Sequence, residues 1–197
     1  LPRPIWRQFE DADFHAHASH LASQHECLRL LRAFQEAGIP VIPLKGAALA
    51  MTVYERSIAR IMEDMDLLVR PSDRQKAQGV LGRLGYQETG TGHLSPWQAR
   101  MFSSYLFQMP FQQKERNAVV DLHWGILKGI EDESLDVDRF FSHVSLNRHN
   151  GARCLLLAPE DMLTHLCLHL YRVAGSRAPL WIWITDIVEV CRQSHDR

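Results

Sequence analysis

The chain has 197 residues, of which 46% are hydrophobic and 23% are charged, a composition typical of a globular protein with one substantial core. Its 22 basic and 23 acidic residues give a formal net charge of −1. This balance lacks the excess of positive charge that general nucleic-acid binding requires, although it leaves room for a small or localised nucleic-acid substrate.

The first elements along the chain are expected to be a lead-in, a helix, a strand and a second helix. Residues 1–17 show no clear pattern and are expected to be irregular. Apolar residues recur at helical spacing over 18–37, which predicts an amphipathic helix, and Gly38 is a typical residue to end it. The apolar segment 41–44 predicts a short buried strand, and the small residues within 46–56 predict the next helix.

The middle of the chain is expected to supply the other strands of a sheet. An acidic strand covers 64–70, and Pro71 favours the start of a helix that Gly85 caps. Residues 101–113 and 117–124 are rich in β-forming residues and predict two antiparallel strands joined by a polar turn.

The last third of the chain is expected to be mostly helical. Residues 125–150 are polar and mixed, with one short helix at 136–141, and 153–157 is expected to be a strand. Pro159 and the two acids after it favour a helix start, and a second helix begins near Pro179. Both helices carry an apolar stripe.

Together these elements predict an α/β fold of the α+β type, in which a small mixed sheet is flanked by helices. We expect the main domain, with its N-terminal helix, to cover residues 1–157. A helical C-terminal segment is expected to cover residues 158–197.

The cysteines and the N-terminal residues indicate the compartment. The four cysteines form no CxxC pair, so we expect free thiols rather than a disulfide framework. No apolar run is long enough to cross a bilayer, and the opening LPRPIWRQFEDADF lacks the apolar core of a signal peptide. A cytoplasmic protein with no membrane partner is the expectation.

Two carboxylates in the acidic strand carry the strongest chemical signal. Asp64 and Asp66 stand two residues apart, so on a strand their side chains point to the same face. Such a pair is unfavourable unless a cation lies between them, and a hard divalent ion, usually Mg²⁺, commonly fills that role. Asp121 can join them if its strand pairs with theirs. Three acids from two strands can hold two metal ions around a reacting phosphate.

The turn before the small-residue helix is suited to a phosphate. Gly46 lets the backbone approach a ligand closely. The backbone N–H groups at the start of the helix, where Ala47 stands, are expected to attract an anion. Lys45 adds a positive charge beside them. The guanidinium of Arg60 either binds phosphate oxygens through two N–H groups or forms a structural salt bridge with Asp64 or Glu63.

Taken in order, these motifs resemble a known family. The segments LKGAAL, R-x-x-x-D-M-D-L-L-V, a helix ending in L-G-Y, and V-D-L-H-W are similar to the bacterial uncharacterised nucleotidyltransferases of the DNA polymerase β-like superfamily. The resemblance covers residues 39–124 and extends more loosely through the helical tail. It implies the nucleotidyltransferase fold, with Asp64 and Asp66 as metal ligands and Asp121 as the third acid, which helps to activate the attacking hydroxyl.

The phosphate turn departs from the superfamily pattern. That turn usually reads Gly-Ser or Gly-Gly, whereas here it reads Gly46-Ala47, so the serine hydroxyl is absent. We expect Lys45 to supply part of the missing contact. Because members of the family tend to have longer chains, the resemblance leaves open whether the natural chain continues beyond Arg197.

The resemblance implies transfer of a nucleotidyl group from a nucleoside triphosphate, with ATP as the expected donor, and release of pyrophosphate. Two Mg²⁺ ions are the expected cofactors. The acceptor is unidentified, and a small molecule, peptide or protein is favoured over nucleic acid; the oligomeric state is left open. The alternative is a non-catalytic nucleotide- or protein-binding module on the same fold, which the absent serine supports.

The 11 histidines raise the question of a zinc site. His165 and His169 stand four apart on an expected helix, as zinc ligands can, but no glutamate follows His165. A polar flank toward the nucleotide cleft, shared with Arg172, is the preferred interpretation. His123 shares a strand face with Asp121, and packing is its expected role.

Overall fold

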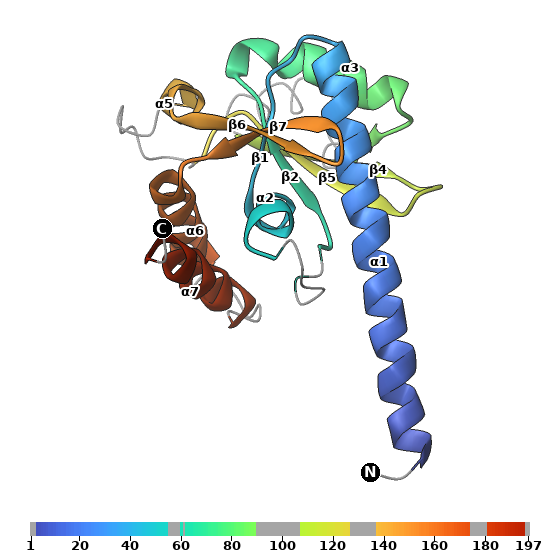
Figure 1. The fold of residues 1–197 in the computed structure, drawn as a ribbon. Coiled ribbons are helices and arrows are strands. Elements are labelled where there is room, and N and C mark those ends of the chain that lie inside the picture. The colour runs from blue at the N-terminus through green and yellow to red at the C-terminus, as the bar shows by residue number, and fades with distance from the viewer. Residues whose placement is uncertain are drawn as a thin grey trace.

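The computed structural model describes residues 3–54, 60, 62–89, 107–126, 137–173 and 181–195. A five-stranded mixed sheet forms its centre (Figure 1), as the sequence predicts. In spatial order the strands are β1 (Ile42–Pro43), β2 (Met65–Leu68), β5 (Ala118–His123), β4 (Gln108–Gln113) and β3 (Gln87–Glu88). The β2–β5 pair is parallel, and the other neighbouring pairs are antiparallel.

The first helix, α1 (Arg3–Glu36), is much longer than the sequence predicts. The expectation of an irregular stretch over 1–17 is wrong, because residues 3–17 belong to the helix. Its first half projects away from the rest of the molecule (Figure 1), with the rings of Trp6, Phe9 and Phe14 exposed. An exposed helix buries no apolar stripe, so the periodicity that reveals a helix is weak there. Gly38, at φ 68°, follows the helix end as expected.

The next helices lie near the predicted positions, with ends that differ by a few residues. They are α2 (Lys45–Thr52), a 3₁₀ turn (Pro71–Asp73) leading into α3 (Arg74–Arg83), and α5 (Val137–Ser142). Gly85 lies just beyond α3 at φ 83°, a left-handed conformation that glycine adopts without strain. The expected end of the small-residue helix at 56 and the first part of the strand at 101–113 lie outside the described residues.

A separate hairpin joins β6 (Val144–His149) to β7 (Ala152–Leu157). The sequence predicts only the second strand. Most residues of β6 are exposed, so no alternation of apolar and polar residues marks it. Its backbone hydrogen bonds to β7, across the tight Asn150-Gly151 turn in which both residues have positive φ, define the strand instead.

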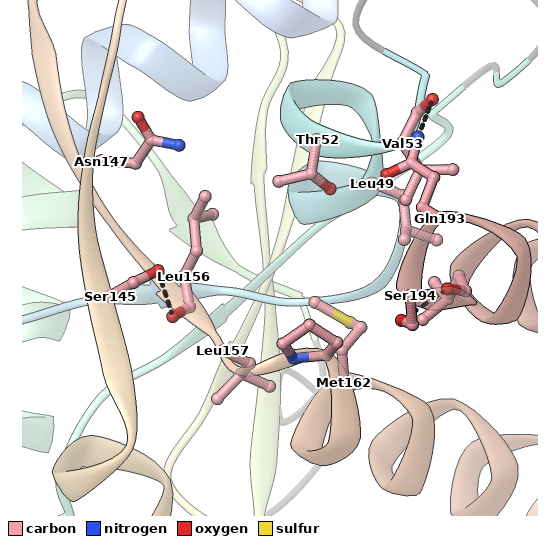
Figure 2. A pocket seen from close by; sticks show the side chains of 12 residues that line it. Leu49, Thr52, Val53, Ser145, Asn147, Leu156, Leu157, Met162, Gln193 and Ser194 are labelled. Atoms are coloured by element: carbon pink, nitrogen blue, oxygen red, sulfur yellow. Dashed lines mark hydrogen bonds between the residues drawn. The ribbon is translucent and has the colours of Figure 1, made fainter. Parts of the chain in front are cut away.

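The chain ends in two helices, α6 (Pro159–Val173) and α7 (Trp181–His195), near their predicted positions. They pack with α5 and one side of α2 into a second apolar cluster (centred on Leu49, Leu68, Phe140, Met162 and Leu166). A small cavity of about 140 Å³ lies between α2, the hairpin and these helices (Figure 2). At its edge Gln193 Nε2 donates to the carbonyl of Val53 at 3.1 Å. This cavity contains none of the acids singled out in the sequence.

None of the helices in the described part of the chain combines the length and apolar character needed to cross a bilayer.

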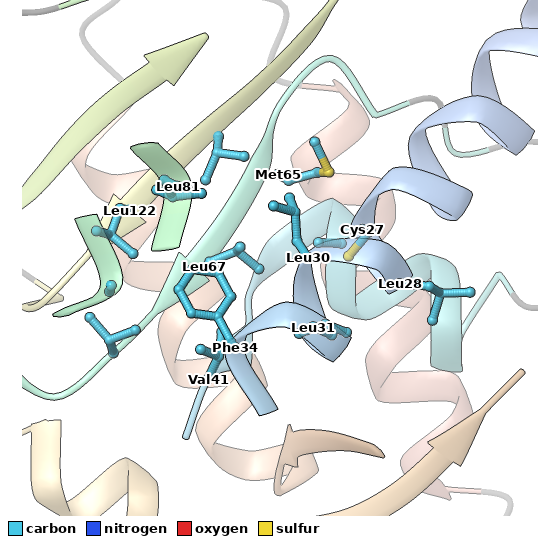
Figure 3. Packing of buried hydrophobic residues seen from close by; sticks show 14 of the residues in the cluster. Cys27, Leu28, Leu30, Leu31, Phe34, Val41, Met65, Leu67, Leu81 and Leu122 are labelled. Carbon is cyan, nitrogen blue, oxygen red and sulfur yellow. The ribbon is translucent and has the colours of Figure 1, made fainter. Parts of the chain in front are cut away.

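The main core lies between the sheet and the second half of α1 (Figure 3). Leu30 and Phe34 stand four apart on α1, so they share one face, and both are fully buried. They meet the side of the sheet that carries Leu67 and Leu122. Burial of each such side chain contributes roughly 1.5–3 kcal/mol.

Replacing Phe34 with alanine should lower the free energy of unfolding by about 3–5 kcal/mol, because it removes a fully buried ring and leaves a cavity. Phe14→Ala on the same helix is the matched control. Phe14 is 70% exposed, so its loss should change stability by less than about 0.5 kcal/mol. Urea unfolding monitored by circular dichroism measures both. Equal effects would contradict the packing described here.

A buried ionic cluster ties α1 to the residues after α3. Glu26 accepts hydrogen bonds from Arg29 Nε at 2.9 Å and from the hydroxyl of Tyr86 at 2.7 Å. Burial raises the pKa of the Glu26 carboxyl, but the hydrogen bonds from Arg29 and Tyr86 outweigh it and hold the pKa below its ordinary value. The ionised form is therefore the one that the fold stabilises.

This cluster predicts an acid-dependent loss of stability. A pKa lowered in the folded state contributes stability above the unfolded value, about 4.3 for glutamate, and the contribution is lost as pH falls toward the folded pKa. The stability difference between wild type and Glu26→Gln should therefore shrink as pH is lowered from 7 to 3. Urea unfolding across that range measures it, and a difference independent of pH would refute the assignment.

Candidate functional site

The parallel pairing of β2 and β5 brings two of the predicted acids together. Asp66 and Asp121 are direct partners in the strand register. With His123 they form a group in which one ligand atom from each residue lies within 4.8 Å of the others. Asp66 is almost fully buried, at 2% exposure. The condition stated from sequence, that the strand of Asp121 must pair with the acidic strand, is met.

Asp66 is surrounded by positive and hydrogen-bonding groups. Its Oδ1 accepts a hydrogen bond from Lys45 Nζ at 2.5 Å, and His123 Nε2 lies 2.8 Å from the same oxygen. Burial raises the pKa of Asp66, but the hydrogen bond with His123 and the charge of Lys45 outweigh it and hold the pKa far below its usual range. Asp66 is thus a buried carboxylate kept ionised. His123, expected to be a packing residue, contacts the site directly.

Asp64 lies at the edge of this arrangement. It occupies the bend directly before β2, is exposed, and is not part of the group formed by Asp66, Asp121 and His123. Partial removal of water by the surrounding protein and the charge of Asp66 raise the pKa of Asp64 to about 6. The structure therefore brings Asp66 and Asp121 together but leaves Asp64 beside them.

Asp121 experiences the same repulsion. Burial and the negative charge of Asp66 raise the pKa of Asp121 above its usual value. Gln108 Nε2 donates to its Oδ2 at 3.1 Å. Two neighbouring carboxylates repel each other, which favours protonation of one of them. A divalent cation bound between them removes this repulsion and stabilises the ionised forms. Asp66, Asp121 and His123 offer oxygen and nitrogen donors that fit such an ion, with Asp64 within electrostatic reach.

The turn into α2 has an unusual backbone. Lys45 adopts φ 44°, in the left-handed region that costs a non-glycine residue about 1–3 kcal/mol. This conformation starts α2 directly after Leu44 and places the lysine side chain, 9% exposed, against Asp66. Lys45 is thus paired with Asp66, so the predicted contact with phosphate requires its ammonium to share or leave this carboxylate.

Gly46 has little room for a side chain, as expected. An added Cβ would lie 3.3 Å from Met62 Cγ and 3.4 Å from Arg60 Nη2. Ala47 is buried, and its N–H donates to the carbonyl of Leu44 at 3.1 Å. The N–H of Ala47 is thus used within the turn.

The whole chain, residues 1–197, matches the model of a family described as uncharacterised nucleotidyltransferase. The chain belongs to this family. No curated protein sequence matches it.

Solved structures of other nucleotidyltransferases share the fold of this family member. The antibiotic-resistance factor ANT(2'')-Ia is 13% identical with a TM-score of 0.59, over 88% of this chain and 83% of that one. A nucleotidyltransferase-like antigen from Paracoccidioides brasiliensis is 18% identical with a TM-score of 0.59, over 89% and 78% of the two chains. The lincosamide adenylyltransferase LnuA, bound to lincomycin, is 12% identical with a TM-score of 0.52, over 82% and 92%. At such identities the likeness establishes the fold alone.

The sequence left two roles open for Arg60, and the structure shows a salt bridge, although not with the expected partners Asp64 or Glu63. Its Nε lies 3.0 and 3.1 Å from the two carboxylate oxygens of Asp186 on α7. Sequence reasoning missed Asp186, because the partners are 126 residues apart and no local pattern links them.

The polar flank expected on α6 faces the site. His165, His169 and Arg172 line a very small cavity together with Lys45 and His123. His165 is 4% exposed, and burial lowers its pKa to about 3, so the ring is neutral. Among the described residues, neither His165 nor His169 belongs to a group of three or more metal-ligand side chains. The zinc interpretation therefore gains no support from the described residues.

Divalent metal ions should stabilise the folded protein, because a bound cation relieves the repulsion between Asp66 and Asp121. Thermal unfolding should show a higher Tm with MgCl₂ than with EDTA for wild type, and no such difference for Asp121→Asn. Asp138→Asn, which removes the same charge from a side chain that is 67% exposed, should keep the wild-type response. A metal response that survives in Asp121→Asn would argue against this site.

Proposed function

We propose that this family member is a metal-dependent nucleotidyltransferase that moves a nucleotidyl group from a nucleoside triphosphate, ATP being the expected donor, to a hydroxyl of an acceptor. The observation that carries the proposal is the register pair Asp66–Asp121 beside the Lys45-Gly46 turn. Acids that can hold metal next to N–H donors that can hold phosphate are the two halves of such a site.

In this proposal Asp64, Asp66 and Asp121 would hold two Mg²⁺ ions, with His123 orienting Asp66. When bound, the ions neutralise the triphosphate and make the acceptor hydroxyl more acidic. Asp66 keeps its charge because Lys45 and His123 hold one of its oxygens. Asp121 accepts the proton of the acceptor hydroxyl. The acceptor oxygen then bonds to the α-phosphorus, and the bond from that phosphorus to pyrophosphate breaks.

The nucleotide side of the site comprises the turn residues Lys45, Gly46 and Ala47, together with Arg60. In this proposal the N–H groups of Lys45 and Gly46, at the start of α2, donate to phosphate oxygens, and Ala47 fixes the helix start through its own N–H. The ammonium of Lys45 contacts Asp66, and in this proposal it can exchange that carboxylate for a phosphate oxygen of the bound nucleotide. Most of the catalytic effect would come from positioning and charge stabilisation.

The structural neighbours support a choice of donor and acceptor class. One is named as a lincosamide antibiotic adenylyltransferase bound to lincomycin, and ANT(2'')-Ia is described in complex with adenylyl-2''-tobramycin. We therefore favour ATP as the donor and a small molecule as the acceptor, with peptides and proteins as the next classes to test. Use of ATP accords with a cytoplasmic site of action.

Pyrophosphate release from ATP and transfer of its α-phosphate label should be measured over a panel of small-molecule alcohols and hydroxyl-bearing peptides. We expect Mg²⁺-dependent turnover that falls about 100-fold or more in Asp66→Asn and in Asp121→Asn, because each substitution removes charge from the metal site. Asp138→Asn should retain wild-type rates. Circular dichroism confirms that each variant is folded.

The non-catalytic alternative predicts a different result. Tight binding of ATP by wild type, with no pyrophosphate release for any acceptor in the panel, would identify a binding module and overturn the proposed activity.

A further inference from the structure

A buried ion pair joins the residues before the DMD motif to the last helix. Arg60 is 9% exposed and Asp186 on α7 is 1% exposed, and two contacts of 3.0 and 3.1 Å link the arginine Nε to the carboxylate. The hydroxyl of Tyr54, which follows α2, also hydrogen-bonds to Asp186. Removing two charges from water is costly, so such a pair is weak evidence for a gain in stability. Its position in the fold suggests another role.

Arg60 is held directly against the phosphate turn. His20 on α1, itself 6% exposed, places its Nδ1 3.1 Å from the carbonyl oxygen of Arg60. At the other end of the residue, Nη2 lies so close to Gly46 that an added Cβ would approach it within 3.4 Å. His20 thus holds the backbone of Arg60, Asp186 holds its Nε, and its Nη2 lies against Gly46.

We propose that Asp186 is a positioning residue for the nucleotide: it holds Arg60 over Gly46 so that the guanidinium binds phosphate oxygens of the incoming triphosphate. The inference rests on the proposed nucleotidyl transfer and makes α7 part of the triphosphate site. Guanidinium groups suit this task because their planar N–H donors match phosphate geometry, and a carboxylate on Nε fixes the plane. Asp186 itself touches no substrate.

A double-mutant cycle on ATP binding tests the coupling. The dissociation constant of ATP in the presence of MgCl₂ is measured by calorimetry for wild type, Arg60→Lys, Asp186→Asn and the double variant. Each single substitution should weaken binding about tenfold, the size expected for a lost charged hydrogen bond. The double variant should bind no more weakly than the weaker single variant, because Asp186 acts through Arg60.

A second acid on α7 supplies the matched control. Glu189 pairs with Arg192 on the same helix, at 2.7 Å. Glu189→Gln removes the same charge and should leave the ATP dissociation constant within about twofold of wild type. Should Asp186→Asn fail to fold, Asp186→Glu, which keeps a charge for Arg60 but displaces the carboxylate, takes its place with the same expected loss.

The possible failures are distinguishable. If folded Asp186→Asn binds ATP as wild type does, or if the two losses multiply in the double variant, Asp186 does not position Arg60 and the inference is overturned. A lower Tm with unchanged ATP affinity would give the pair a purely structural role. If wild type itself neither binds ATP nor releases pyrophosphate, the proposed function fails instead.

Discussion

The parallel pairing of β2 with β5 is the constraint on which the candidate site depends. It sets Asp66 directly beside Asp121 at a place from which water is largely excluded. Two carboxylates this close repel each other, and burial strengthens the repulsion because the surroundings screen it less. The fold tolerates the pair because Lys45 and His123 both contact one oxygen of Asp66. The remaining repulsion between the two carboxylates favours binding of a divalent cation at the site.

The register of this pair is in turn set by the hydrophobic core. Leu67 and Leu122, which alternate with the acids along their strands, point toward α1 and are fully buried. A shift of one residue would expose these leucines to the polar side and bury the acids in the core, so it is strongly disfavoured. Packing on one face of the sheet therefore fixes the geometry of charged groups on the other. The C-terminal helices then close the polar face with His165 and Arg172.

Features governed by local chemistry were predictable. Gly38 and Gly85 adopt the left-handed conformations typical of helix ends, and Gly46 has little space for a side chain. Features without apolar periodicity were missed, even where the Asn150-Gly151 turn between β6 and β7 is a local sign of a hairpin. The first half of α1 and the strand β6 are largely exposed, so neither carries the apolar periodicity by which sequence reveals secondary structure. The division at residues 157 and 158 stays a prediction, as do the assigned roles of the site residues.

The sequence by itself determined which side chains could do chemistry: the acids at 64, 66 and 121, the lysine–glycine turn and the family. The acids follow from the two-residue period of a strand and the turn from the missing side chain of Gly46, both of which act over a few residues, and the order of these motifs indicates the family. Only the tertiary structure decided which groups meet. It placed His123 on Asp66, left Asp64 outside the closest group and joined Arg60 to Asp186. Such contacts depend on strand register and helix packing across the whole chain, and no local pattern encodes them.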